Sequence, residues 1–257
     1  MWHSVLSSFS HLRHGALTLI DQVLFPPHCL ACHVPMDAAH SVCTTCTHSM
    51  HMISEPLCHH CGVPLPYAHH ESELCVDCLT ATPPYDWARG VWVYDDRSAH
   101  LISQLKFSDR THLASYMGNL MRLRTTEMIT PQTWVVPVPL HRSRLRQRRY
   151  NQSLLLAHYV AKHNGILIPD ALMRIRNTQP QTTLDYHDRQ SNVVGCFNVP
   201  KRHQANIKGA RIMLVDDVRT TGATLHACTE TLRYHGAAWV GVITAAIRIR
   251  SETLDDL

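Results

Sequence analysis

No stretch of this sequence is long and apolar enough to cross a membrane. Its longest apolar runs, such as Trp239–Ile243, fall far short of the roughly 20 residues that a membrane-spanning helix needs. The run Ala16–Ile20 is too short, and too far into the chain, for the core of a signal peptide. We therefore expect a cytoplasmic protein without a membrane span.

Charge of one sign is missing from two long stretches. No Lys or Arg lies between Arg13 and Arg89, and no acid lies between Glu127 and Asp170. The first stretch is unsuited to gripping phosphate groups, because it offers them no cation. The second contains several closely spaced arginines, which repel one another unless an anion binds among them.

Cysteine, by contrast, is concentrated in one segment. Of the 10 cysteines, those between residues 29 and 78 form four Cys-x-x-Cys pairs. Two such pairs supply the four thiolates of a closed, tetrahedral zinc site, whereas disulfides are rare in a reducing cytoplasm. We expect two structural zinc ions, with the ligands Cys29, Cys32, Cys43, Cys46, Cys58, Cys61, Cys75 and Cys78.

The spacing leaves the pairing of these ligands open. In the more economical arrangement the first two pairs hold one zinc ion and the last two hold the other. In a crossed arrangement the first pair joins the third and the second joins the fourth. Either way, residues 28–80 form a double zinc-ribbon module with a formal charge of −5. Two ions with four thiolates each take that charge to about −9 and leave about +9 on the rest of the chain.

We expect three parts: an N-terminal helical segment at residues 1–27, the zinc module at 28–80 and an α/β domain at 85–257. In the last part, apolar runs alternate with helical stretches, which favours a mainly parallel sheet covered by helices. Ligands of such a sheet bind at the carboxyl ends of its strands. Strands are predicted at Gly90–Tyr94, Trp134–Val138, Arg211–Val215 and Trp239–Ile247, and helices at Asn151–His163 and Gly222–His235.

One strand leads into a candidate phosphate site. After Val215 come two acids, then a hydroxyl-rich turn that opens a helix. The backbone N–H groups and hydroxyls of such a turn can hold a phosphate, while the carboxylates accept hydrogen bonds from ribose hydroxyls, directly or through magnesium. As strand-end carboxylates, both acids would contribute little to the core. The predicted ribose and phosphate ligands are Asp216, Asp217, Thr220, Thr221, Gly222, Ala223 and Thr224.

This segment resembles the phosphoribosyl-pyrophosphate signature of type I phosphoribosyltransferases. The segments Val136–Arg142 and Arg144–Gln152 are similar to those of the ComF/GntX family, and so is the cysteine array. The similarity runs from Cys29 to about Ile249. The pair Arg149–Tyr150 departs from the usual Gly-Phe, which affects the start of a helix rather than the ligand pocket. Downstream matches are Thr178, Gln181, Leu184, Arg189, Asn192, Val193 and Phe197.

The resemblance implies two uses for the basic segment. In the resembled enzymes the loop after this strand holds pyrophosphate, which suits guanidinium groups. The same side chains could instead follow the backbone of single-stranded DNA, with Tyr150 as a stacking face. The residues concerned are His141, Arg142, Arg144, Arg146, Arg148 and Arg149.

The resemblance also implies a function, since members of the family are associated with DNA uptake in natural competence or with use of external DNA as a nutrient. Two hypotheses follow. A binding module would hold phosphoribosyl pyrophosphate or ribose 5-phosphate together with single-stranded DNA and proteins of the competence machinery. An enzyme would transfer the sugar from phosphoribosyl pyrophosphate, with magnesium, to an unidentified nucleobase-like acceptor. The sequence names no catalytic residue.

Overall fold

The computed structural model describes residues 26–66, 73–107, 110–162, 164–176 and 195–249. By their contacts, the residues form two compact units that divide between Ser49 and Met50. The predicted helical segment at residues 1–27 therefore lies almost wholly outside the described part. Six of the family matches also lie outside it: Thr178, Gln181, Leu184, Arg189, Asn192 and Val193.

The first unit, as far as it is described, is small and carries the first cysteine set. An isolated antiparallel bridge joins His28 to Pro35, and the short helix α2 (Thr44–Ser49) follows. The N–H of Cys29 donates to the carbonyl of Val34 at 2.8 Å, which closes the turn that holds the first cysteine pair.

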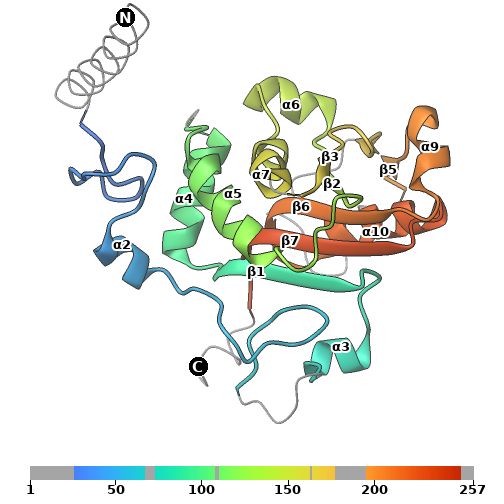
Figure 1. Ribbon diagram of the computed structural model, residues 1–257, viewed down its shortest axis with the longest axis horizontal. Helices are drawn as coiled ribbons and strands as arrows, with labels where there is room; N and C mark the ends of the chain where they lie inside the picture. Colours follow the sequence, from blue (N-terminus) through green and yellow to red (C-terminus); the bar gives the residue numbers. More distant parts are fainter. Residues whose placement is uncertain (1–25, 67–72, 108–109, 163, 177–194, 250–257) are drawn as a thin grey trace, which may run out of the picture. The chain divides into compact units, whose positions relative to one another are not determined.

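The second unit is built on a parallel sheet of five strands (Figure 1). Every neighbouring pair in it is parallel, as the alternation of apolar runs and helices predicts. In spatial order the strands are β1 (Trp87–Val93), β7 (Trp239–Ile247), β6 (Arg211–Arg219), β2 (Trp134–Pro137) and β3 (Ile166–Leu167).

Helices cover both faces of this sheet (Figure 1). On one face lie α5 (Leu113–Arg124) and α7 (Gln152–Ala161), which pack so closely that a Cβ added at Gly118 would meet the Tyr159 side chain at 2.6 Å. On the other lies α10 (Ala223–Tyr234), whose buried residues share a core with alternate residues of β2, β6 and β7. The remaining elements are α3 (Val76–Thr80), α4 (Asp96–Phe107), α6 (Arg142–Arg148), α9 (Lys201–Ile207) and the antiparallel pair β4 (Met173–Arg174) and β5 (Phe197–Asn198).

The predicted strands are present, but β6 is longer than its apolar run. It continues past Val215 to Arg219, and Asp216 pairs with Thr244 of β7. Because β7 extends to Ile247, it offers backbone partners to the residues of β6 beyond Val215. The two acids therefore sit within the sheet rather than just after it.

The second cysteine set belongs to the second unit. Its buried members pack in the same core cluster as Tyr85 and residues of α10. The sequence grouped both cysteine sets in one module at residues 28–80, whereas the contacts divide the chain between them. Among the described residues, no helix has the length and apolar character to span a membrane.

Candidate functional site

The cysteines come together in two separate clusters. Within each cluster the four Sγ atoms lie within 4.8 Å of one another. The described cysteines are all free of disulfides. The sequential pairing is therefore confirmed and the crossed one excluded: Cys29, Cys32, Cys43 and Cys46 form one set, and Cys58, Cys61, Cys75 and Cys78 form the other. Each set has the composition and spacing of a closed, structural zinc site.

The two sets share one local geometry. The N–H of Cys43 donates to Cys29 Sγ at 3.3 Å, and the N–H of Cys75 donates to Cys58 Sγ at 3.3 Å. Such bonds favour a thiolate over a thiol at the accepting sulfur. Gly62, directly after Cys61, has φ +70°, and a Cβ there would lie only 2.4 Å from the carbonyl oxygen of Ala88 in β1. The second set therefore packs directly onto the sheet.

A cavity of about 550 Å³ opens at the carboxyl end of β6. Its lining includes every residue of the predicted ribose and phosphate site: Asp216, Asp217, Thr220, Thr221, Gly222, Ala223 and Thr224. Gly222 has φ +78°, which only glycine adopts at low cost, and α10 begins at the next residue. The turn thus presents the start of a helix to the cavity, which is an arrangement suited to an anion.

The two acids are bound to neighbouring side chains. Asp217 Oδ1 pairs with Lys106 Nζ at 2.8 Å, and Gln152 Nε2 donates to Asp217 Oδ2 at 2.8 Å. Ser153 Oγ donates to Asp216 Oδ1 at 2.9 Å. Asp217 is only 5% exposed, so the expectation that both acids would contribute little to the core is wrong for this residue.

Asp216 differs in its electrostatics from an ordinary carboxyl. Burial and the neighbouring charge of Asp217 raise the pKa of Asp216 to about 7. Hydrogen bonds from the Asp217 N–H and from Ser153 act in the opposite direction. The charge of Asp216 therefore depends on pH near neutrality.

The basic segment forms the short helix α6, which separates its arginines into two groups. Arg144 and Arg148, one turn apart, line the cavity. Arg142, Arg146 and Arg149 are exposed and lie outside the cavity lining. His141 is also outside the lining; it caps the helix by accepting the N–H of Ser143 at 3.3 Å. The residues that the sequence groups as one basic cluster are thus divided: two arginines line the cavity, and the other members lie outside its lining.

Further cations face the cavity from other elements. Arg174 of β4 and Arg248, directly after β7, belong to its lining. Burial, together with the nearby charges of Arg174 and Arg148, lowers the pKa of Arg144. Cations from α6, from β4 and from the end of β7 thus face one cavity, which is an arrangement suited to an anion with several charged oxygens.

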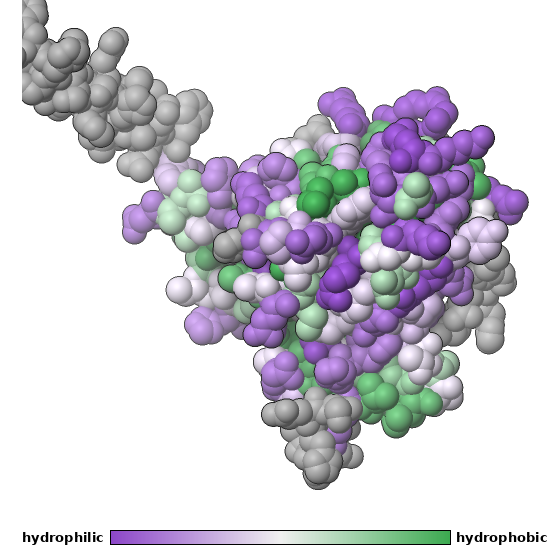
Figure 2. All heavy atoms as spheres, turned by 45° about the vertical axis from the view of Figure 1, so that its right-hand side comes forward, coloured by the Kyte–Doolittle hydropathy of each residue, from purple (hydrophilic) through white to green (hydrophobic). Residues whose placement is uncertain are grey.

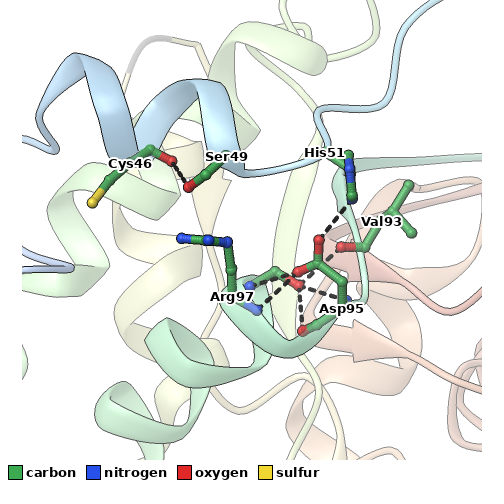
Figure 3. Close-up of polar contacts among 7 residues, drawn as sticks. Cys46, Ser49, His51, Val93, Asp95 and Arg97 are labelled. Carbon is green, nitrogen blue, oxygen red and sulfur yellow. Dashed lines mark hydrogen bonds and ion pairs between the residues drawn. The ribbon is translucent and has the colours of Figure 1, made fainter.

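Lys106 reaches the acid pair from the end of α4, and the start of that helix is firmly held (Figure 3). Asp95 Oδ1 accepts the N–H of Arg97 at 3.1 Å and that of Ser98 at 2.8 Å. The other oxygen of Asp95 contacts His51 Nδ1 at 2.9 Å, as Figure 3 shows. A capping carboxylate of this kind stabilises the first turn and, with it, the direction in which α4 delivers Lys106.

Sequence reasoning missed several residues of the cavity, which are Lys106, Gln152, Ser153, Arg174 and Arg248. Gln152 and Ser153 are the first two residues of α7. The predicted start of this helix was therefore the sequence signal that could have placed them near the acids. Arg174 and Arg248 reach the cavity through the tertiary fold, and nothing in their immediate sequence marks them.

The departure at Arg149–Tyr150 has a local structural meaning. Arg149 ends α6 with φ 65°, a left-handed conformation that favours glycine. Tyr150 donates from its hydroxyl to the carbonyl of Leu105, next to Lys106. The departure lies between α6 and α7, outside the cavity lining, in agreement with the sequence-based expectation.

Two family models match the chain. A double zinc ribbon domain matches residues 20–79, and a phosphoribosyl transferase domain matches residues 153–256. The first match spans both cysteine sets, and the second spans α7 through β7, which includes the acid pair and the turn that follows it.

Curated relatives match across both regions. The DNA utilization protein YhgH of Escherichia coli is 33% identical over 84% of this chain and 95% of its own length. Competence protein F of Haemophilus influenzae is 29% identical over 83% of this chain and 94% of its own, and competence protein ComFC of Bacillus subtilis is 27% identical over 77% and 80%. With a double zinc ribbon, a phosphoribosyltransferase domain and these relatives, the chain belongs to the ComF/GntX family.

Proposed function

We propose that the cavity binds the ribose 5-phosphate part of phosphoribosyl pyrophosphate. The observation that carries this proposal is the order of groups along one wall: two carboxylates, then a glycine turn and a helix start. The 5-phosphate would sit on the N–H groups of Thr220–Thr224. The ribose hydroxyls would donate to Asp216 and Asp217.

Gln152 supports this orientation. Its side chain is 3% exposed and lines the cavity, and its Nε2 is engaged by Asp217. Its Oε1 has no hydrogen-bond partner among the described residues. A buried acceptor without a donor costs about 1–3 kcal/mol, so a hydroxyl from a bound sugar would remove that cost.

The pyrophosphate would lie among Arg144, Arg148 and Arg174. Magnesium suits the carboxylate oxygens chemically, since it prefers oxygen ligands and is commonly shared between carboxylates and substrate phosphates. Lys106 already neutralises Asp217, however. We therefore propose that magnesium enters with the diphosphate rather than as a resident ion, with Asp216 as its protein ligand.

In the cell, we propose a role in DNA uptake or DNA utilisation, in the cytoplasm and with single-stranded DNA and competence proteins as partners. The names of the relatives support the role, and cysteine-only zinc sites suit a reducing compartment. Hydrophilic residues predominate on the face of the molecule shown in Figure 2, with apolar ones in smaller areas between them. Arg142 and Arg146, exposed outside the cavity, are the candidates for contacts with the DNA backbone.

A second candidate function is transfer of the phosphoribosyl group to a nucleobase-like acceptor. Tyr94 and Phe107 line the same cavity, and the Arg148 guanidinium lies 4.7 Å from the centre of the Phe107 ring. Aromatic side chains of this kind can stack a base beside the sugar. Pyrophosphate release from phosphoribosyl pyrophosphate in the presence of a base mixture would support this candidate.

Isothermal titration calorimetry with paired variants tests the proposal. We expect Arg144→Glu/Arg148→Glu to abolish binding of phosphoribosyl pyrophosphate with magnesium and to weaken ribose 5-phosphate less. The matched pair Arg142→Glu/Arg146→Glu should leave both ligands unaffected but weaken single-stranded DNA and reduce the salt dependence of its binding. If the cavity pair binds phosphoribosyl pyrophosphate like the unaltered protein, the assignment of the cavity is wrong.

A further inference from the structure

Arg219 is a buried cation at the start of the phosphate turn. It is the last residue of β6, directly before Thr220, and is 7% exposed. Its Nη1 donates to the Tyr85 hydroxyl at 3.0 Å. In the part of the chain that the structure describes, no carboxylate forms an ion pair with it. A guanidinium buried in this way is costly unless an anion lies nearby.

The second cysteine set supplies that anion. The Arg219 side chain is hydrogen-bonded to Cys61 as well as to Tyr85, and Cys61 packs in the same buried core cluster as Tyr85. Four zinc-bound thiolates carry a net charge of about −2 with their ion. The cation on the phosphate turn therefore faces the anionic side of a zinc ribbon.

Tyr85 joins the two regions physically. It is 3% exposed and stacks on His60, which lies between Cys58 and Cys61, with ring centroids 5.5 Å apart. Its ring also meets the edge of His226 at 5.7 Å. His226 belongs to α10 and packs under the turn, since a Cβ added at Gly222 would lie 3.2 Å from its Nε2. The phosphate turn thus packs on His226, His226 contacts Tyr85, and Tyr85 stacks on His60 between two cysteines of the second set.

We propose that Arg219 is a positioning residue for the phosphate turn, and that it makes the second zinc ribbon a structural part of the ligand site. This inference rests on the function proposed above. The backbone of Arg219 is also held in place, because the N–H of Arg248 donates to the Arg219 carbonyl at 2.8 Å. Loss of the metal would remove the fixed negative charge behind Arg219. The guanidinium would then turn toward the cavity and displace the turn at Thr220–Thr224.

The two cysteine sets provide a matched comparison. Cys61→Ser removes a ligand beside Arg219, and Cys32→Ser removes the corresponding ligand of the set in the first unit. Each variant should lose one zinc ion, measured by elemental analysis. We expect the affinity for phosphoribosyl pyrophosphate with magnesium to fall by about tenfold or more in Cys61→Ser and to change by less than about twofold in Cys32→Ser. Equal effects of the two variants would overturn the inference.

Tyr85→Phe tests the link without touching the metal. It removes the hydroxyl that accepts from Arg219 and keeps the ring against His60 and His226. Tyr85 is not part of the cavity lining, so a loss of affinity cannot come from a lost ligand contact. With two zinc ions still bound, we expect affinity to fall by about fivefold to tenfold. Arg219→Lys should retain more affinity than Arg219→Gln, because it keeps the charge.

Hydrogen–deuterium exchange separates this inference from the proposed function. Without any ligand, residues 220–224 should exchange faster in Tyr85→Phe than in the unaltered protein. Unchanged exchange there would refute the role of Arg219 even if the ligand binds. If the unaltered protein fails to bind phosphoribosyl pyrophosphate while exchange still responds, the proposed function is wrong and the link between zinc ribbon and turn holds.

Discussion

Replacing Asp217 with Asn tests whether the acid pair belongs to the fold as well as to the site. The side chain of Asp217 is 7% exposed and that of Lys106 is 22% exposed, and their charged atoms are 2.8 Å apart. Removing one partner of a fully buried ion pair costs about 3–5 kcal/mol. Here Lys106 can turn toward the cavity, and Asn can still accept the hydrogen bond from Gln152. We therefore expect a loss of about 1–2 kcal/mol.

Thermal unfolding of a double-mutant cycle measures this coupling. In a domain of this size, about 1 kcal/mol shifts the melting temperature by roughly 2–4 °C, so Asp217→Asn should lower it by about 2–8 °C. Lys106→Met should also be destabilising, because it leaves the Asp217 carboxylate without its cation. The double variant should lose at least about 1 kcal/mol less than the two single losses together.

The exposed residues Glu230 and Lys201 serve as controls, since Glu230→Gln and Lys201→Met should leave the melting temperature nearly unchanged. Strictly additive effects of Asp217→Asn and Lys106→Met would refute the ion pair as a stabilising contact. So would a melting temperature that neither variant changes.

Three further predictions concern pH, zinc and the end of α6. Because the pKa of Asp216 is raised to about 7, the folded state binds more protons than the unfolded state between about pH 4 and 7, so stability should fall as pH rises through that window. Binding of the magnesium-loaded ligand needs the ionised carboxylate, so calorimetry should show affinity rising from pH 6 to pH 8, and Asp216→Asn should remove that rise. Elemental analysis should find two zinc ions per chain. Removal of these ions by a strong chelator should lower the melting temperature. A folded, metal-free protein with unchanged stability would contradict this prediction. Arg149→Gly should leave stability unchanged or raise it by up to about 1 kcal/mol, whereas Arg146→Gly within α6 should cost about 1 kcal/mol; equal losses in the two variants would argue against the left-handed end of the helix.

Local patterns were enough to predict the parallel sheet, the clustered cysteines and the turn that leads from β6 into α10. The cysteine spacing identifies ligands because two residues separate the cysteines of each zinc-binding pair. The turn can be recognised because its acids, hydroxyls and glycine follow one another closely in the sequence. The pairing of the cysteines needed three-dimensional distances, since the spacing is compatible with both arrangements.

What escaped sequence reasoning depends on contacts between distant segments. Lys106 meets Asp217 only because α4 ends beside β6, and Arg219 and Tyr85 meet although they lie 134 residues apart in the sequence. The arginines of the basic segment were read as one cluster, whereas helical phase in α6 sends Arg144 and Arg148 into the cavity and leaves Arg142 and Arg146 outside it. The helix α6 could not be predicted from hydrophobic periodicity, because this short basic segment has no apolar stripe.

A crystal structure of the protein with phosphoribosyl pyrophosphate and magnesium tests the central claim most directly. We expect the 5-phosphate on the N–H groups of Thr220–Thr224, a ribose hydroxyl within hydrogen-bond distance of Gln152 Oε1, and the diphosphate between Arg144 and Arg174. A cavity that stays empty at saturating ligand, or a ligand bound away from Asp216 and Asp217, would contradict it.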